Sequence, residues 1–482
     1  MIANRIEKRI HIIFICACLI FGAILLKLGY EQIVHQDFTM EKAMNLWQRD
    51  FPVAGRRGAI LDRNGTALAY DIPSTSVMVV PAQIKEPKQT AAVLADILEA
   101  DADAIHEKIT NHVSTQKLQP EGRLISDEAA VKLENADLDG VYLIQDSQRY
   151  YPNHSYLAQV LGFTGIDNQG LAGLELQYEE ILGAKKGALQ IPFDAKGNQV
   201  DLYDETYEAS GKGMDVVLTI DANIQDIVER EMNNLMKRYH PKEALAIAMD
   251  PNNGEILAMV SKPDFDPNDY QNYDSTIINR NLPIWKSFEP GSTFKSVTFA
   301  SALDLKLFDM FQDTYYDRGY EMVGGARIKS WKAGGHGLQT FLQVLENSSN
   351  PGFVEISRRM GLDHLYEYVM KFGFGKKTNV DLPGESTGIM FEKEAMGEVE
   401  QATVAFGQGI SVTPIQLVRA FSAIVNGGTL YEPHITKAIQ DPATGEIIEE
   451  IKPKAVDQVI SKETSDLMRY ALESVVANGG GK

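Results

Sequence analysis

Cysteine is almost absent from this sequence. The only two cysteines, Cys16 and Cys18, lie in one apolar run near the N-terminus, and none follows in the rest of the 482 residues. A disulfide within a folded domain and a metal site built on cysteine are therefore excluded. The nine histidines are scattered, with no His-x-x-x-His pair. We expect neither a metal site nor a cofactor.

Positive charge is scarce as well. The chain has 46 lysines and arginines against 66 aspartates and glutamates, which makes a formal net charge of −20. An acidic chain repels phosphate, so we exclude nucleic acid as a partner. The hydrophobic share of 44% is ordinary for a folded protein, and the length suggests about two to four domains.

One long apolar run is present, from Ile10 to Leu26, interrupted only by His11. Its length of about 17 residues lies at the short end of what a membrane-spanning helix needs. A cleavable signal peptide is the alternative, but residues 26–30 offer no small-x-small cleavage site. We therefore expect an uncleaved, single-pass anchor over residues 10–30 that contacts membrane lipid.

A positively charged flank precedes this run and consists of Arg5, Lys8 and Arg9. The positive-inside rule places such a flank in the cytoplasm. We expect residues 1–9 to form a cytoplasmic tail at the cell membrane, with the chain outside the cytoplasm from about residue 31 onward.

The polar, glycine-containing stretch 195–215 indicates a domain boundary, which we place between residues 31–210 and residues 211–482. In the first part, spacing predicts a helical stalk over 31–50 that ends at Pro52, and Asn64-Gly65 predicts a hairpin. Helical periodicity over residues 89–110, and a short helix with a strand over 123–150, complete a mixed α/β pattern.

The second part opens with a strand over residues 216–220 and a helix over 222–239. Two apolar runs, 244–249 and 255–260, are joined by a Pro-Asn-Asn-Gly turn and predict an antiparallel hairpin. A helix that starts near residue 292 follows. Helices packed on an antiparallel sheet make the α+β class the expected fold.

Ser292 and Lys295 stand in a Ser-Thr-Phe-Lys segment after Glu-Pro-Gly, at this predicted helix start. Residues three apart lie on one helical face, and a serine hydroxyl becomes a good nucleophile when a neighbouring base removes its proton. A buried lysine is such a base if its pKa falls toward neutrality. The alternative is an ordinary helix-start serine, because residues 114–117 read Ser-Thr-Gln-Lys with nothing catalytic around them.

A second polar cluster is formed by Ser348, Ser349 and Asn350. By itself it is equally typical of turn residues at a helix C-terminus. A hydroxyl can also relay protons to a leaving group, and a carboxamide can orient a substrate amide.

Together, the Ser-x-x-Lys motif at 292–295 and the Ser-x-Asn motif at 348–350 resemble the first two motifs of penicillin-binding transpeptidases and serine β-lactamases. Further stretches resemble signatures of the class B penicillin-binding proteins, at residues 57–69, 149–152, 170–175 and 406–414. The resemblance covers almost the whole chain. It favours a sporulation-specific member, acting in spore cortex synthesis, with a division-type member as the near alternative.

The resemblance implies a mixed α/β pedestal (dimerisation) domain within residues 31–210 and a serine β-lactamase-like transpeptidase domain over 211–482. The implied activity is D,D-transpeptidation, which cross-links peptidoglycan stem peptides. Ser292 would attack the penultimate D-alanine carbonyl and Lys295 would take its proton. Ser348 would pass a proton to the leaving amine, and Asn350 would hold the stem-peptide amide. Penicillin and other β-lactams would bind as mimics of the D-alanyl-D-alanine end.

Other positions carry weaker signals. A substrate-lining backbone or a simple turn is expected at Gly407, Gln408 and Gly409. Structural ion pairs and turn caps, rather than catalysis, are expected of Arg57, Asp62, Arg63 and Glu175.

The chain departs from the family in one respect, because no Lys-Thr-Gly or Lys-Ser-Gly motif occurs in the 482 residues. Residues 377–379 read Lys-Thr-Asn, lack the glycine and come before the Gly407 region. We therefore expect the chain, taken literally, to be a defective or incomplete transpeptidase, and favour a truncated gene sequence as the reason.

Two functions compete with the transpeptidase. One is a non-catalytic scaffold that docks on a membrane glycosyltransferase, the protein partner that we expect beside stem peptides and β-lactams. The other is a β-lactamase or β-lactam sensor, against which the large first domain argues.

Overall fold

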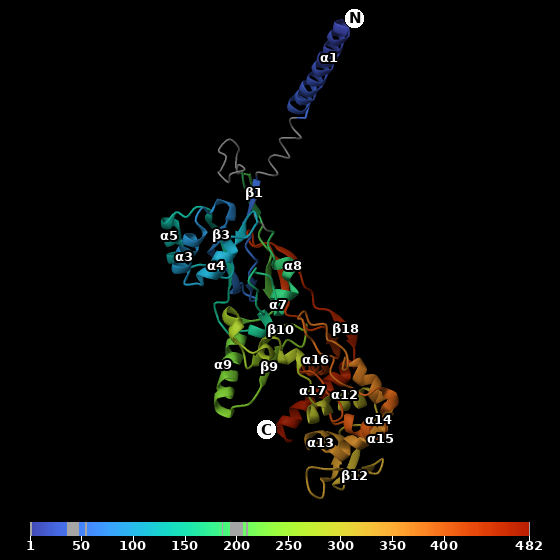
Figure 1. Ribbon diagram of the computed structural model, residues 1–482. Coiled ribbons are helices and arrows are strands. Elements are labelled where there is room, and N and C mark those ends of the chain that lie inside the picture. The colour runs from blue at the N-terminus through green and yellow to red at the C-terminus, as the bar shows by residue number, and fades with distance from the viewer. Residues whose placement is uncertain are drawn as a thin grey trace. The chain divides into compact units, whose positions relative to one another are not determined.

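The computed structural model describes residues 2–35, 48–53, 55–185, 187–192, 206–208 and 211–481. Packing divides the chain into two compact units (Figure 1). The first unit combines Met1–Gly55, Pro73–Gln148 and Lys185–Gly211. The second combines Arg56–Ile72, Arg149–Ala184 and Lys212–Lys482. Each unit is therefore assembled from stretches that are far apart in the sequence.

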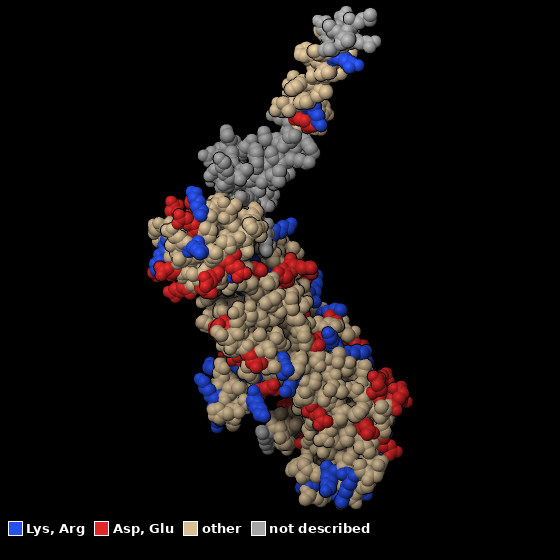
Figure 2. All heavy atoms as spheres, viewed as in Figure 1, with Lys and Arg blue, Asp and Glu red and all other residues tan. Residues whose placement is uncertain are grey.

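The first element is one long apolar helix, α1 (Ile2–Gly29), which continues into a π-helical turn, η1 (Tyr30–Val34). Within it, Arg9–Ile33 is long and apolar enough to span a membrane, with a mean hydropathy of 2.6 and no buried residues. Figure 2 shows that most of the helix surface carries no charge, with charged atoms near its ends. So large an apolar surface needs an apolar surrounding, in keeping with a single-pass anchor.

The helical stalk predicted over residues 31–50 is wrong for residues 48–50, which the structure places in a strand. Gln48–Val53 form strand β1, which pairs antiparallel with β6 (Gly187–Pro192), and β6 pairs with β7 (Thr206–Glu208). Pro52 lies inside this strand, at the edge of its sheet, which is where a residue without a backbone N–H is tolerated. Non-local strand pairing overrides the helical pattern, and residues 36–47 of the prediction lie outside the described residues.

The core of the first unit lies between strands and three helices (Figure 1). Its strands are the later part of β3 (Ala67–Val79), β4 (Gln116–Lys117) and β5 (Val141–Tyr150), and β4 and β5 each pair with β3. The helices are α3 (Pro87–Leu98), α4 (Ala102–Ile109) and α5 (Asp127–Ala136). Val77 and Val79 point to these helices, as the two-residue period of a strand requires. The periodicity predicted over 89–110 breaks at Glu99, whose φ of 52° ends α3.

A sheet of the second unit holds the short strand β2 (Ile60–Leu61) between two neighbours. It pairs antiparallel with β3 across the predicted Asn64-Gly65 turn, and parallel with β8 (Asp215–Leu218). Beyond β8 come β16 (Thr436–Gln440) and β17 (Ile447–Glu450). Gly65 has a φ of 87°, which the turn requires, so the hairpin prediction is confirmed.

The predicted helix and hairpin that follow are also confirmed. Asp221 caps the N-terminus of α9 (Ala222–Tyr239). This helix packs on the antiparallel pair β9 (Ala244–Met249) and β10 (Ile256–Lys262). Helices on an antiparallel sheet confirm the α+β class.

The largest core surrounds helix α12 (Lys295–Asp304), which is buried along almost its whole length. Helices α13 (Phe341–Glu346), α14 (Asn350–Lys371), α16 (Pro414–Val425) and α17 (Lys462–Ala477) pack against it. The remaining helices of this unit are α6 (Ala158–Leu161), α7 (Gly173–Gln177), α8 (Glu179–Leu182), α10 (Ser275–Ile278), α11 (Leu282–Trp285) and α15 (Glu398–Val404). Small strand pairs are β11 (Thr314–Asp317) with β14 (Gly337–Thr340), β12 (Tyr320–Val323) with β13 (Ala326–Lys329), and β15 (Thr429–Tyr431) with β18 (Ala455–Gln458).

Candidate active site

Ser292 and Lys295 lie at the junction of two helical elements. Ser292 is in a 3-10 turn, η4 (Gly291–Phe294), and Lys295 is the first residue of α12. The α-helix therefore begins three residues later than predicted, because a tighter turn precedes it. The Ser292 side chain is exposed, whereas Lys295 is only 1% exposed. A solvent-accessible hydroxyl thus stands one turn from a buried amine.

The second predicted motif lies beside this amine. Lys295 Nζ donates to Ser348 O at 2.8 Å, to Ser348 Oγ at 2.9 Å and to Asn350 Oδ1 at 2.7 Å. Ser348 Oγ donates to Ser292 Oγ at 3.1 Å. The structure brings the four residues together, with the Ser348 hydroxyl between Ser292 and Lys295.

Burial lowers the pKa of Lys295 from 10.5 to about 7. The cause is the loss of hydration, since a charged ammonium is poorly stabilised inside a protein core. The Phe353 ring centre lies 5.3 Å from Nζ and forms part of the apolar surrounding. At neutral pH this amine can accept a proton, which an ordinary surface lysine cannot do.

The segment Gly407–Gly409 lies against the turn that carries Ser292. Gly291 N donates to Gly407 O at 2.9 Å, and a Cβ at residue 407 would lie 2.1 Å from Gly291 O. Gly409 N donates to Glu289 Oε1 at 2.9 Å, and Gln408 is exposed. Glu289 is a contact that sequence reasoning missed, because its partner is a backbone amide with no signature in the sequence.

The two similar sequence matches have other surroundings. In the first unit, Lys117 of the Ser-Thr-Gln-Lys match forms an ion pair with Asp146 at 3.2 Å. In the Lys-Thr-Asn match, the Thr378 side chain is buried and donates to Glu385 at 2.6 Å. Neither match therefore places a serine or threonine hydroxyl beside a buried lysine amine, as the site at Ser292 does.

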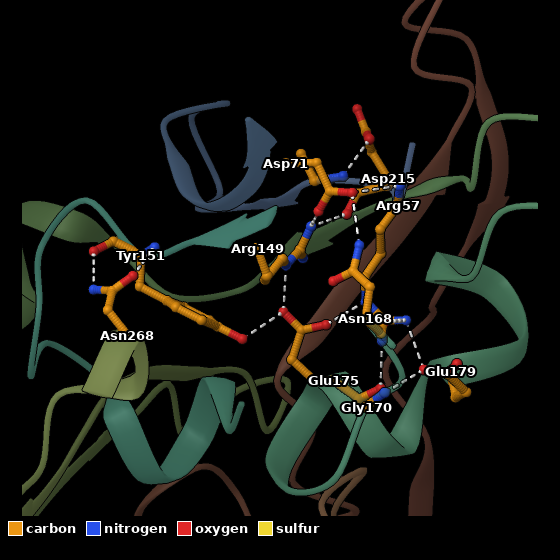
Figure 3. A network of polar contacts seen from close by, with 12 residues as sticks. Arg57, Asp71, Arg149, Tyr151, Asn168, Gly170, Glu175, Glu179, Asp215 and Asn268 are labelled. Atoms are coloured by element: carbon orange, nitrogen blue, oxygen red, sulfur yellow. Dashed lines mark hydrogen bonds and ion pairs between the residues drawn. The ribbon is translucent and has the colours of Figure 1, made fainter. Parts of the chain in front are cut away.

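A buried ionic network lies elsewhere in the second unit (Figure 3). Arg57 and Arg149 each donate to one oxygen of Glu175, at 2.6 and 2.7 Å, and Tyr151 donates to it at 3.3 Å. Arg149 also pairs with Asp71 at 3.3 Å. Burial, together with the Glu175 charge, raises the pKa of Tyr151 well above its usual range. The interpretation of Arg57 and Glu175 as structural ion-pair partners is confirmed.

Asp62 and Arg63 have structural contacts too. Asp62 accepts hydrogen bonds from the backbone of Asn64 and Thr66 and so caps the hairpin turn, and Arg63 pairs with Glu255 at 3.0 Å. Within the described residues, no group of three or more His, Cys, Asp or Glu side chains is placed to hold a metal ion.

Two family models match the chain: the penicillin-binding protein dimerisation domain over residues 52–218, and the penicillin-binding protein transpeptidase domain over residues 244–482. The chain belongs to the class B penicillin-binding proteins. This penicillin-binding protein is 48% identical over 477 residues to "Stage V sporulation protein D" of Bacillus subtilis. The aligned region makes up 99% of this chain and 74% of that protein. The family predicted from the motifs is confirmed.

More distant relatives agree. The penicillin-binding protein is 28% identical to "Peptidoglycan D,D-transpeptidase FtsI" of Escherichia coli, over 99% of this chain and 79% of that protein. The crystal structure of penicillin binding protein 2X from Streptococcus thermophilus is similar with a TM-score of 0.69 and 26% identity, over 88% of this chain and 66% of that chain. This penicillin-binding protein is therefore of the peptidoglycan D,D-transpeptidase type, and a transpeptidase domain implies binding of peptides and β-lactams.

Proposed function

We propose that this penicillin-binding protein cross-links peptidoglycan stem peptides through an acyl-enzyme on Ser292. The observation that carries the proposal is the buried Lys295 amine, which contacts Ser348 while Ser348 contacts Ser292. Because burial lowers the pKa of Lys295 to about 7, about half of the amines are unprotonated at neutral pH. An unprotonated amine is the general base that the serine needs.

In the first half-reaction, the Ser292 oxygen attacks the penultimate D-alanine carbonyl carbon. Its proton moves to the Ser348 hydroxyl as the Ser348 proton moves to Lys295 Nζ. When the C–N bond breaks, the proton returns through Ser348 to the nitrogen of the departing D-alanine. The product is an ester between Ser292 and the donor peptide.

In the second half-reaction, an amine of a neighbouring stem peptide attacks the ester carbonyl. Lys295 receives the amine proton through Ser348 and returns it to the Ser292 oxygen as the ester bond breaks. The new amide is the cross-link. A β-lactam enters the same route, but its opened ring stays attached, so Ser292 remains blocked.

Asn350 and the 407–409 segment hold the substrate in this proposal. Asn350 Oδ1 accepts from Lys295 at 2.7 Å, so its Nδ2 is the atom that donates to a stem-peptide carbonyl. The exposed Gln408 and the backbone of Gly407 and Gly409 line the substrate beside the nucleophile turn.

The biological setting is also a proposal. Identity of 48% over 99% of the chain with a protein named for stage V of sporulation supports a role in sporulation-specific wall synthesis. The apolar helix Arg9–Ile33, with basic residues before it, supports a single-pass anchor whose N-terminus is cytoplasmic. A membrane glycosyltransferase is the partner that would supply glycan strands to such an anchored enzyme.

Labelling with fluorescent penicillin in detergent tests the proposal. We expect covalent label on the wild-type chain, formed at a reduced rate because the 482 residues contain no Lys-Thr-Gly motif. We expect none on Ser292→Ala, and as much label as on the wild-type chain on Ser114→Ala, the matched serine of the other Ser-x-x-Lys segment. Release of the label within minutes would indicate a β-lactamase. A natively folded wild-type chain without label would contradict the proposal and leave the scaffold function.

A further inference from the structure

A small lobe of the second unit contacts the turn that carries Ser348. The lobe consists of residues 314–340, in which β11 pairs with β14 and β12 pairs with β13. Trp331 Nε1 donates to Asn347 O at 2.8 Å, and Asn347 Nδ2 donates to Gln339 Oε1 at 3.0 Å. Ser349 Oγ donates to Asp317 Oδ2 at 2.9 Å. The lobe thus holds the residue before Ser348 and the residue after it.

The backbone of Ser348 explains why such support is needed. Its φ is 49°, in the left-handed region that residues other than glycine rarely adopt. A strained conformation persists only when its surroundings hold it. In this conformation the Ser348 hydroxyl reaches Ser292 while the Ser348 carbonyl and hydroxyl both reach Lys295.

Asp317 is the most deeply buried part of this support. Its side chain is fully buried, and its two oxygens accept from Gly319 N at 2.7 Å and from Ser349 Oγ. A Cβ at Gly335 would lie 2.6 Å from Asp317 Oδ1, so the loop closes tightly over the carboxylate. Hydrogen bonds to a buried carboxylate are strong. Because the Ser349 hydroxyl donates its proton to Asp317, its oxygen is free to accept from Gly352 N at 3.2 Å, which caps the N-terminus of α14.

We propose that Asp317 is a positioning residue for the transpeptidation reaction, and that Trp331 is its counterpart on the other side of Ser348. Asp317 acts through Ser349, and Trp331 acts through Asn347. Together they hold the Ser348 hydroxyl between the nucleophile and the base. The effect on acylation rests on the proposed function, but the coupling of Asp317 to the turn that carries Ser348 can be tested separately.

The first test uses the indole N–H signals in a spectrum of the ¹⁵N-tryptophan-labelled chain in detergent. The chain has three tryptophans, and Trp331→Phe identifies the Trp331 signal. Asp317→Asn replaces one carboxylate oxygen, an acceptor, by an amide NH₂ group, a donor. We therefore expect the turn over residues 347–349 to shift and the Trp331 signal to move. Glu321→Gln is the matched control, because Glu321 lies in the same lobe but has Tyr315, Arg318 and Arg358 as its described partners. It should leave the Trp331 signal in place.

The second test separates chemistry from binding. Asp317→Asn should slow the acylation step with fluorescent penicillin by about tenfold or more while the dissociation constant of the initial complex stays unchanged. Ser349→Ala, which removes the same hydrogen bond from the other side, should do the same, and Glu321→Gln should not. If neither the wild-type chain nor any variant is acylated, the proposed function fails. The indole signals then still test whether Asp317 holds the turn that carries Ser348.

The proposal is overturned if Asp317→Asn folds and changes neither the Trp331 signal nor the acylation step. It is also overturned if Glu321→Gln has the same effects as Asp317→Asn. If neither Asp317→Asn nor Ser349→Ala folds, Asp317 has a structural role only, and the positioning role is rejected.

Discussion

In the proposed reaction the charge of Lys295 decides whether Ser292 is activated, and its titration yields a quantitative prediction. Burial lowers its pKa from 10.5 to about 7. This lowering corresponds to about 5 kcal/mol against charging the amine inside the core. At pH 7 the neutral form is then about 1,600 times more abundant than in a lysine with an unshifted pKa.

The perturbation is a change of pH. Between about pH 8 and about pH 6 the neutral fraction of Lys295 falls from about 0.9 to about 0.1, so acylation should slow by about tenfold with a midpoint near pH 7. The assay is the rate of fluorescent-penicillin labelling of Ser292 across this range. In parallel, ¹³C-lysine spectra follow the titration directly, and Lys295→Arg identifies the signal.

The same group makes stability depend on pH. Between about pH 7 and pH 10.5 the unfolded chain binds a proton that the folded chain does not, so the free energy of unfolding rises with pH by up to about 1.4 kcal/mol per unit. Lys295→Met removes this contribution, and the stability difference between wild type and variant should therefore change with pH in that window. A Lys295 signal that titrates near its ordinary pKa, or a difference independent of pH, would refute the reasoning.

Three further predictions concern a close backbone contact, the buried ionic network and a helix N-cap. Gly407→Ala places a Cβ 2.1 Å from Gly291 O, and we expect acylation slowed by about tenfold or more, whereas Gly325→Ala has a similar positive φ but open space and should acylate normally. Glu175→Gln leaves two buried arginines poorly compensated, and urea unfolding should show a loss of about 3–5 kcal/mol; a loss below about 1 kcal/mol would contradict the ionic network. Thr413→Ala removes the N-cap of α16 and should lower stability by about 1 kcal/mol in thermal unfolding, so an unchanged melting temperature would count against that cap.

Local signals in the sequence predicted many elements of this fold. Asn64-Gly65 predicted the β2–β3 hairpin, and helical spacing after Asp221 predicted α9, because both depend on neighbouring residues. The motif spacing also predicted that Ser292, Lys295 and the 348–350 turn belong to one site, although only through resemblance to a family.

Features set by distant contacts could not be predicted in this way. Strand β1 forms because residues 48–53 pair with residues 187–192, and nothing near Pro52 indicates that partner. The burial of Lys295 follows from several helices around α12, so a single helix pattern does not show it. Asp317 contacts Ser349, which lies 32 positions later in the chain, and it does so from a lobe whose polar strands look like ordinary surface.

The assembly of the second unit from three stretches has a practical consequence for protein engineering. A gene fragment cut at residue 211 would lack β2, leaving β8 with an unpaired edge, and would also lose Arg57, Arg149 and Glu175. Exposed strand edges and missing core favour aggregation. A chimera that swaps this unit between homologous penicillin-binding proteins must therefore exchange Arg56–Ile72 and Arg149–Ala184 along with the stretch from Lys212 onward, so five junctions need to be matched at once.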